Sequence, residues 1–145
     1  YEAYQLEKAS LKTPILIIRY TLPKNFQVSK RLNFSFPVYD QNTLAPLINT
    51  VHAKIHLKID TGINRLGILL RQARNFAQLL KKYRCLKVES IYAHLAKTSQ
   101  PQEKKFLQKQ IKTFQKVISI FKEEGFHFHW KHCATTAGAM QVFDP

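Results

Sequence analysis

The residues best suited to chemistry in this sequence are Lys58 and Arg65, which stand close together in HLKIDTGINRLG, residues 56–67. A lysine that is partly withdrawn from water beside an arginine has its ammonium form disfavoured by desolvation and by like charge, which raises the neutral, nucleophilic fraction. A neutral lysine amine can add carbon dioxide to form a carbamate, whose negative charge would pair with the guanidinium. The alternative for Lys58 is a structural salt bridge with Asp60 or with a carboxylate elsewhere.

The segment that leads to this pair is predicted to be a strand with two different faces. Residues 52–60, HAKIHLKID, alternate between apolar and polar side chains, which is the period of a β-strand. The apolar face consists of Ile55, Leu57 and Ile59, and the opposite face of Lys54, His56, Lys58 and Asp60. Polar groups in so apolar a strand cost free energy unless they are paired, so we expect this face to line an interior or a cleft.

Strands and helices are predicted to alternate along the rest of the chain. Apolar or alternating runs indicate strands at residues 15–20, 36–40, 88–96 and 126–134. Helical spacing indicates helices within residues 1–12, 42–48, 70–84 and 99–124, and a further helix opening near residue 135. Asp40 is placed to cap the second helix, Ser99 to begin the longest and Gly125 to end it. About five parallel strands alternating with helices predict an α/β fold, either an open sheet or part of an eight-stranded barrel.

Polar side chains gather at the carboxyl ends of the predicted strands. They are Lys58 and Asp60, then His94, then His132 with Thr135 and Thr136. In open sheets and in eight-stranded barrels, this edge is where the chemistry takes place. The turn at residues 135–138, TTAG, could bind a phosphate through backbone N–H groups, a threonine hydroxyl and the helix dipole, although threonine is also a common helix N-cap.

Several familiar site types are absent from the sequence. It contains no GxGxxG, GxxxxGK or GxSxG motif, which argues against a dinucleotide fold, a P-loop enzyme and a serine hydrolase. His127 and His129 would share one face of a strand while His132 lies on the other, so they do not predict a metal site. Cys85 and Cys133 lack zinc or disulfide spacing and are predicted to be small buried thiols.

Composition predicts one globular domain with an excess of positive charge. The chain has 145 residues, 45% of them hydrophobic, and a formal net charge of +14 from 23 Lys and Arg against 9 Asp and Glu. Such a charge favours polyanions, but the cations are spread along predicted helices and no recognition motif accompanies them, so a nucleic-acid partner is not expected. No apolar run reaches the roughly 20 residues that span a bilayer, so we expect no membrane partner and a cytoplasmic location.

Several segments together resemble the alanine racemase family. HLKIDTGINRLG, IYAHLA, the QxxxF pair Gln110 and Phe114, and HCATTAGAM follow the order of that family, which has VHLKIDTGMNRLG, TH(F/L)A and HxANSA elements. The opening EAYQLEKASLKTPILII is similar to the family's EAxxLRxAGIxxPILVL, so the resemblance covers essentially all 145 residues. It implies a pyridoxal 5'-phosphate enzyme on a (β/α)8 TIM-type barrel, a homodimer that interconverts L- and D-alanine for peptidoglycan synthesis.

The resemblance also implies roles for individual residues. Lys58 corresponds to the lysine that is carbamylated in many members, and Arg65 to the arginine that this lysine orients toward the cofactor's phenolic oxygen and the substrate carboxylate. His94 is similar to the histidine beside the cofactor ring. Thr136 stands where a serine helps to hold the phosphate and keeps the hydroxyl, whereas Thr135 replaces an asparagine. No metal is implied.

By the order of the family, residues 1–145 are the central part of the N-terminal barrel domain, with its third to seventh strands. The Schiff-base lysine on the first strand, the arginine that meets the pyridine nitrogen and the catalytic tyrosine of the C-terminal β domain are expected outside these residues. We therefore expect this fragment to be inactive alone. The alternatives are a non-catalytic basic barrel fragment that binds nucleic acid or another polyanion, and a related cofactor-binding barrel without racemase activity.

We expect the coding sequence upstream of Tyr1 to contain a strand that ends in a lysine motif of the VxKAxAYGHG kind. The flanking DNA of the natural gene checks this directly. Intact flanking sequence without such a lysine would exclude catalysis by the family's usual route and would favour a degenerate or repurposed barrel.

Overall fold

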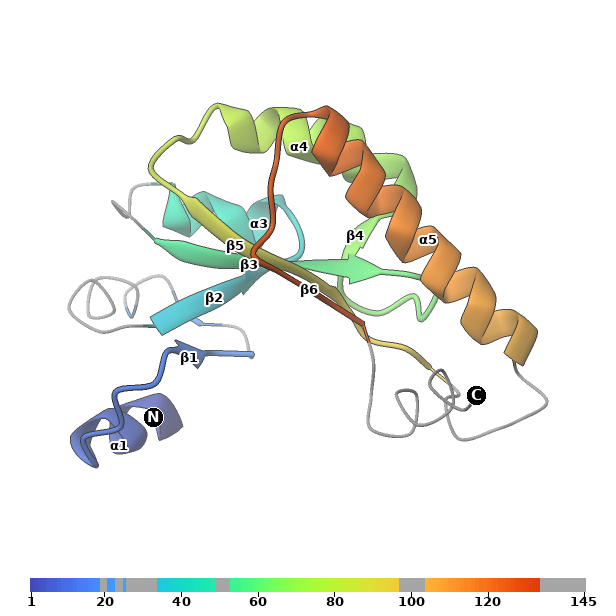
Figure 1. Ribbon diagram of the computed structural model, residues 1–145. Helices are drawn as coiled ribbons and strands as arrows, with labels where there is room; N and C mark the ends of the chain where they lie inside the picture. The colour runs from blue at the N-terminus through green and yellow to red at the C-terminus, as the bar shows by residue number, and fades with distance from the viewer. Residues whose placement is uncertain (19–20, 23–24, 26–33, 49–52, 97–103, 134–145) are drawn as a thin grey trace.

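A computed structural model describes residues 1–18, 21–22, 25, 34–48, 53–96 and 104–133 (Figure 1). Its strands are β1 (Ile15–Leu16), β2 (Phe34–Val38), β3 (Lys54–Asp60), β4 (Ile68–Leu69), β5 (Lys87–Ala93) and β6 (Trp130–His132). Its helices are α1 (Glu2–Lys8), α3 (Gln41–Leu44), α4 (Ala73–Lys81) and α5 (Lys104–Glu123), with 3-10 turns η1 (Ala45–Leu47) and η2 (Leu70–Gln72).

The described strands form one parallel sheet in the order β1-β2-β3-β5-β6. Neighbours in the sheet are thus neighbours in the chain, apart from β4. This strand has only two residues and pairs with the end of β3, where Ile59 lies opposite Ile68. The predicted five parallel strands are confirmed, and β4 is a sixth that is too short to produce an alternating pattern.

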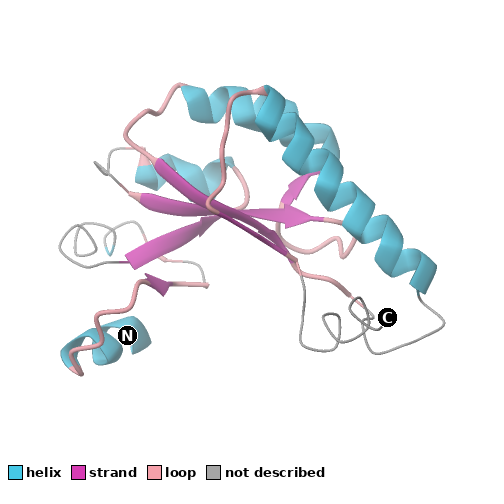
Figure 2. Ribbon diagram, viewed as in Figure 1, coloured by secondary structure: helices cyan, strands magenta, loops and turns pink. Residues whose placement is uncertain are grey.

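One face of the sheet carries the hydrophobic core. Figure 2 shows α3, α4 and α5 on one side of the strands. Ile55, Leu57 and Ile59 on β3 are between 0% and 1% exposed and belong to the same core cluster as Val117 and Phe121 of α5. Within the described residues no helix covers the opposite face, which holds the polar side chains of β3. The result is a parallel half-barrel with its helices outside and a polar inner face, as the alternation predicts.

Ion pairs join the two outer helices at one end. Glu124, which follows α5, accepts hydrogen bonds from Arg74 at 2.8 Å and from Lys81 at 2.7 Å, so one carboxylate binds two turns of α4. Gly125 ends this helix with a φ of +87°, as predicted. Asp40 caps α3, because its Oδ1 accepts from the backbone N–H of Thr43 at 2.7 Å.

Several predicted strands have other bounds in the structure. In the described part of residues 15–20, only Ile15–Leu16 form a strand, and Ile18 is 74% exposed. The strand expected at residues 36–40 is Phe34–Val38, and the strand expected at residues 88–96 is Lys87–Ala93. In the described part of residues 126–134 the strand is Trp130–His132, while Phe126 and Phe128 pack edge-on against Phe121.

The two thiols also differ from the prediction, because Cys85 and Cys133 are half-buried rather than buried.

The capping box expected at Ser99 lies outside the described residues. Among the described helices, none is long and apolar enough to cross a membrane.

Candidate active site

The carboxylate of Asp60 organises the turn that follows β3. It accepts four backbone hydrogen bonds, from Gly62, Ile63 and Asn64 at 2.8, 2.9 and 3.2 Å on Oδ1 and from Arg65 at 2.8 Å on Oδ2. Burial by itself would raise the pKa of Asp60, but these N–H donors outweigh it and the pKa lies below its usual value. The backbone that carries Arg65 is therefore tied to the end of the strand.

Gly67 closes this turn by direct contact with β3. Its φ is +152°, and a Cβ atom at this position would lie 2.3 Å from the backbone nitrogen of Asp60. Gly62 has a φ of +125° but open space around it. Glycine is required at position 67 because two backbone segments approach each other closely there. This close approach lets the next residue, Ile68, pair with β3.

Lys58 is half-buried on the inner face and its pKa is lowered, first by desolvation and then by the charge of Arg65. This is the direction expected from the sequence. The alternative salt bridge with Asp60 does not form among the described residues, and the carboxylate of Asp60 binds backbone N–H groups instead. Asp60 only opposes the lowering of the Lys58 pKa from a distance.

Three predicted site residues meet at the carboxyl edge of the sheet. Lys58 from β3, Arg65 from the turn and His94 from the end of β5 line one small pocket, together with Ile59, Asp60, Ile63 and Leu66. Arg65 and His94 are exposed, whereas Lys58 is half-buried. The carboxylate in this lining, Asp60, is already bound by backbone N–H groups, so the two basic side chains and the imidazole suit the pocket to an anionic ligand.

The comparisons with known proteins identify the family. The model of the family described as "Alanine racemase, N-terminal domain" matches residues 1–144. This chain belongs to that family. The resemblance seen in the sequence is confirmed.

Curated relatives extend well beyond the matched region. The chain is 32% identical over 148 residues to an alanine racemase of Desulforamulus reducens, covering 97% of this chain and 39% of that protein. It is 28% identical to alanine racemase 1 of Oceanobacillus iheyensis, covering 99% of this chain and 39% of that protein. The chain spans about two fifths of the length of these relatives.

Solved structures confirm the partial barrel fold. The alanine racemase of Bacillus anthracis with bound L-Ala-P aligns with a TM-score of 0.82 at 26% identity, covering 94% of this chain and 36% of that chain. The alanine racemase of Clostridium difficile 630 gives 0.87 at 23% identity, covering 96% and 40%. A histidine racemase of Leuconostoc mesenteroides gives 0.77 at 22% identity, covering 94% and 37%, so the fold is not confined to enzymes named for alanine.

A row of uncharged aromatic side chains lies beside Lys58 on the inner face of the sheet. Lys58 is in register with Tyr92 on β5, and Tyr92 with His132 on β6. The two rings stack with centroids 5.2 Å apart and an angle of 10°. Burial and the proximity of Tyr39 raise the pKa of Tyr92 to about 12, and desolvation lowers the pKa of His132. Both rings are therefore neutral at pH 7.

The row below joins β3 to β5 through His56. Its Nδ1 lies 2.5 Å from the hydroxyl of Ser90, and its Nε2 lies 3.6 Å from a carboxylate oxygen of Glu89. The register shifts between Ile55 and His56, so Glu89 is the extra residue of a bulge. Burial lowers the pKa of His56 against the opposing effect of Glu89. Ser90 is 0% exposed, so this pair supports the sheet rather than acting as a nucleophile.

Ser90 and Tyr92 were not among the predicted site residues. The alternation along β5 places them on the same face as His94, and this pattern is the signal that could have identified them. Thr135 and Thr136 lie outside the described residues, and their roles stay predictions. Within the described part of the chain, no group of three His, Cys, Asp or Glu side chains could hold a metal ion.

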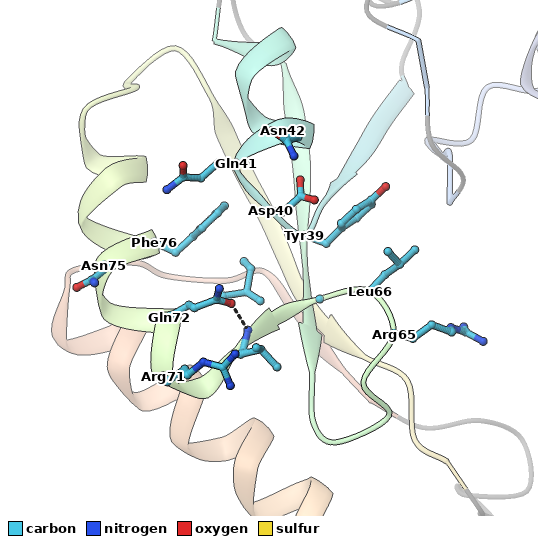
Figure 3. A pocket seen from close by; sticks show the side chains of 13 residues that line it. Tyr39, Asp40, Gln41, Asn42, Arg65, Leu66, Arg71, Gln72, Asn75 and Phe76 are labelled. Atoms are coloured by element: carbon cyan, nitrogen blue, oxygen red, sulfur yellow. Dashed lines mark hydrogen bonds between the residues drawn. The ribbon is translucent and has the colours of Figure 1, made fainter.

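A wider groove of about 660 Å³ lies between α3 and α4 on the other side of the Arg65 loop (Figure 3). Its walls include Gln41 and Asn42 of α3 and Phe76 of α4. Gln72 lines it as well and accepts from the N–H of Leu69 at 3.0 Å. Figure 3 shows the Arg65 side chain directed away from α4. Arg65 thus lines both this groove and the small pocket that Lys58 and His94 line.

Replacing Asp60 with Asn is expected to destabilise the protein by about 1–3 kcal/mol at pH 7, since an amide has one acceptor oxygen and would leave either the Arg65 N–H or the three N–H groups on Oδ1 without an acceptor. Because the folded-state pKa is lowered, the contribution of Asp60 is complete above about pH 4 and is lost as the pH falls through the folded pKa. The wild type and Asp60→Asn should therefore converge in acid. Denaturant titrations at several pH values measure this, and a difference that does not change with pH would contradict it.

Proposed function

We propose that the full-length natural polypeptide is an alanine racemase that uses pyridoxal 5'-phosphate, and that this chain supplies the part of its site that binds and neutralises anionic groups. The observation that carries the proposal is the convergence of Lys58, Arg65 and His94 on one pocket, in a chain that matches the family over residues 1–144. The carboxyl edge of a parallel barrel is where such sites are built.

The residues present suit this cofactor. Pyridoxal phosphate carries a phosphate, a phenolic oxygen and an aromatic ring, and when bound it withdraws electrons from the substrate so that its α-proton can be removed. The inner face offers a guanidinium from Arg65 for the phenolic oxygen or the substrate carboxylate, and an imidazole from His94 beside the ring. Thr136, with its hydroxyl, and Thr135 are proposed to hold the phosphate, together with the N-terminus of the helix that the sequence predicts near residue 135.

The backbone of Arg65 is held in place, whereas its guanidinium is exposed and available to a ligand. Its N–H is held by Asp60 at 2.8 Å, while its exposed guanidinium forms no ion pair with a described residue. A guanidinium remains charged at any physiological pH and can bind a carboxylate through two parallel hydrogen bonds. Arg65 is thus suited to orient an anionic substrate group without changing its own charge.

Lys58 is proposed to be carbamylated. Its neutral amine attacks carbon dioxide, a nitrogen–carbon bond forms, and one proton is released as the carbamate appears. Desolvation and the charge of Arg65 both favour the neutral amine that this reaction needs. The resulting negative charge then lies in the same pocket as Arg65 and fixes the direction of the guanidinium.

Racemisation needs a proton acceptor on one face of the substrate and a donor on the other. We propose that these groups, a lysine and a tyrosine in the family's pattern, come from segments outside these 145 residues and from a partner subunit. The isolated chain is then inactive, and the homodimer acts in the cytoplasm to supply D-alanine for peptidoglycan.

The proposal is tested by incubating the full-length polypeptide with L-alanine and pyridoxal phosphate and measuring D-alanine by chiral chromatography. Replacing Arg65 with Ala should lower kcat/KM by roughly a hundredfold, the size seen when a preorganised charge is removed from a site. Arg71→Ala, in the neighbouring groove, is the matched control and should stay near the wild type. No alanine racemisation by the wild type would refute the proposal, and histidine is the alternative substrate to assay.

Carbamylation of Lys58 is tested with 13C-bicarbonate. We expect a 13C carbamate resonance in the full-length polypeptide, present in Lys54→Ala and absent in Lys58→Ala, because Lys54 lies on the same strand but does not line the pocket. Since the pKa of Lys58 is lowered, labelling should begin at a lower pH than for a surface lysine and increase as the pH rises. A resonance that survives in Lys58→Ala would assign the carbamate elsewhere.

A further inference from the structure

Gln110 is a polar residue in the middle of the apolar stripe of α5. It is 0% exposed, although its neighbours on the same face are core residues, among them Leu107, Phe114 and Val117. Burying an amide costs free energy unless both its oxygen and its nitrogen are hydrogen-bonded. The hydrogen-bond partners of Gln110 therefore indicate why a polar side chain occupies this buried position.

Both partners of Gln110 lie at the carboxyl edge of the sheet. Its Oε1 accepts a hydrogen bond from the backbone N–H of Ala96 at 3.2 Å, and its Nε2 donates to the hydroxyl of Thr61 at 3.3 Å. The backbone N–H of Ala96 can only donate, so the amide oxygen must face it and the nitrogen must face Thr61. The donor N–H of Ala96 therefore fixes which end of the Gln110 amide carries the oxygen.

These partners belong to the two segments that carry the pocket residues. Thr61 follows Asp60 and opens the turn that holds Arg65, and it is 6% exposed. Ala96 lies two residues beyond His94, in the segment that leaves β5. One side chain on a helix outside the barrel thus joins the end of β3 to the end of β5.

We propose that Gln110 is a positioning residue that fixes the separation of these two segments, so that Arg65 and His94 face one pocket. Its effect on catalysis rests on the proposed function, whereas its effect on the two segments does not. An uncharged amide is suited to this place because it supplies one acceptor and one donor together. Methionine fills the same volume with neither, and glutamate adds a negative charge close to Asp60.

The test is hydrogen–deuterium exchange of the full-length polypeptide carrying Gln110→Met. The control is Gln108→Met, the same substitution at an exposed position of the same helix. We expect exchange at Ala96 and at residues 62–65 to accelerate roughly tenfold in Gln110→Met, as for the loss of a buried hydrogen bond, while amides of α4 keep their protection. Equal acceleration everywhere would show a general loss of stability, and no change at these sites would equally overturn the proposal.

Thr61→Val provides a second variant that keeps the shape of the side chain. It removes the partner of the Gln110 nitrogen and should accelerate exchange in residues 62–65. Once Gln110 is methionine, adding Thr61→Val should change exchange little, because the bond is already lost. Fully additive effects would mean that the two residues act separately and would overturn the proposed bridge.

Activity gives an independent measurement. If the full-length polypeptide racemises alanine, Gln110→Met should lower kcat by roughly tenfold more than Gln108→Met, since displaced site residues lose productive geometry. Equal kcat values would overturn the catalytic part of the proposal. If the wild type shows no racemase activity, the proposed function fails, but the exchange experiment still decides whether Gln110 joins the two segments.

Discussion

The hydrogen bonds between the carboxylate of Asp60 and four backbone N–H groups are the constraint on which the site depends. They convert the exit of β3 from a flexible connection into a turn of fixed shape. The turn brings Arg65 to the pocket that Lys58 also lines. The same carboxylate forms no salt bridge with Lys58 and opposes the lowering of the Lys58 pKa only in part. One interaction thus fixes the backbone of the arginine whose charge lowers the pKa of the lysine.

The two faces of the sheet have different roles, since one stabilises the fold and the other carries the candidate site. The helix-covered face is apolar and buried, and it holds the strands in register. The inner face carries two rows, in which the His56 and Ser90 pair lies beneath Lys58, Tyr92 and His132. Burial keeps the imidazole and phenol groups of these rows neutral, so the positive charge at the carboxyl edge comes from Lys58 and Arg65. An anionic ligand at this edge would be compensated by these two residues.

Much of this arrangement could be predicted from local patterns. The alternation in residues 52–60 predicted the faces of β3, and the glycines and Asp60 around Arg65 indicated a turn. The bulge at Glu89 could not be predicted, because it depends on the register between β3 and β5. The bridge from Gln110 to Thr61 joins positions 49 residues apart and required the packing of α5. Gln110 was noticed in the sequence only as part of a motif, and a motif does not say what a residue touches.

Gly62 and Gly67 look interchangeable in the sequence but differ in what they tolerate. At Gly62 there is space for a side chain, but a φ of +125° strains any residue other than glycine. At Gly67 the same kind of strain is joined by a steric clash, because the space for any side chain is already filled by the backbone of β3. In a library randomised at both positions, a replacement at the first costs backbone strain alone and one at the second costs strain and a clash, which makes Gly67 the more informative position for recognising this turn in distant sequences.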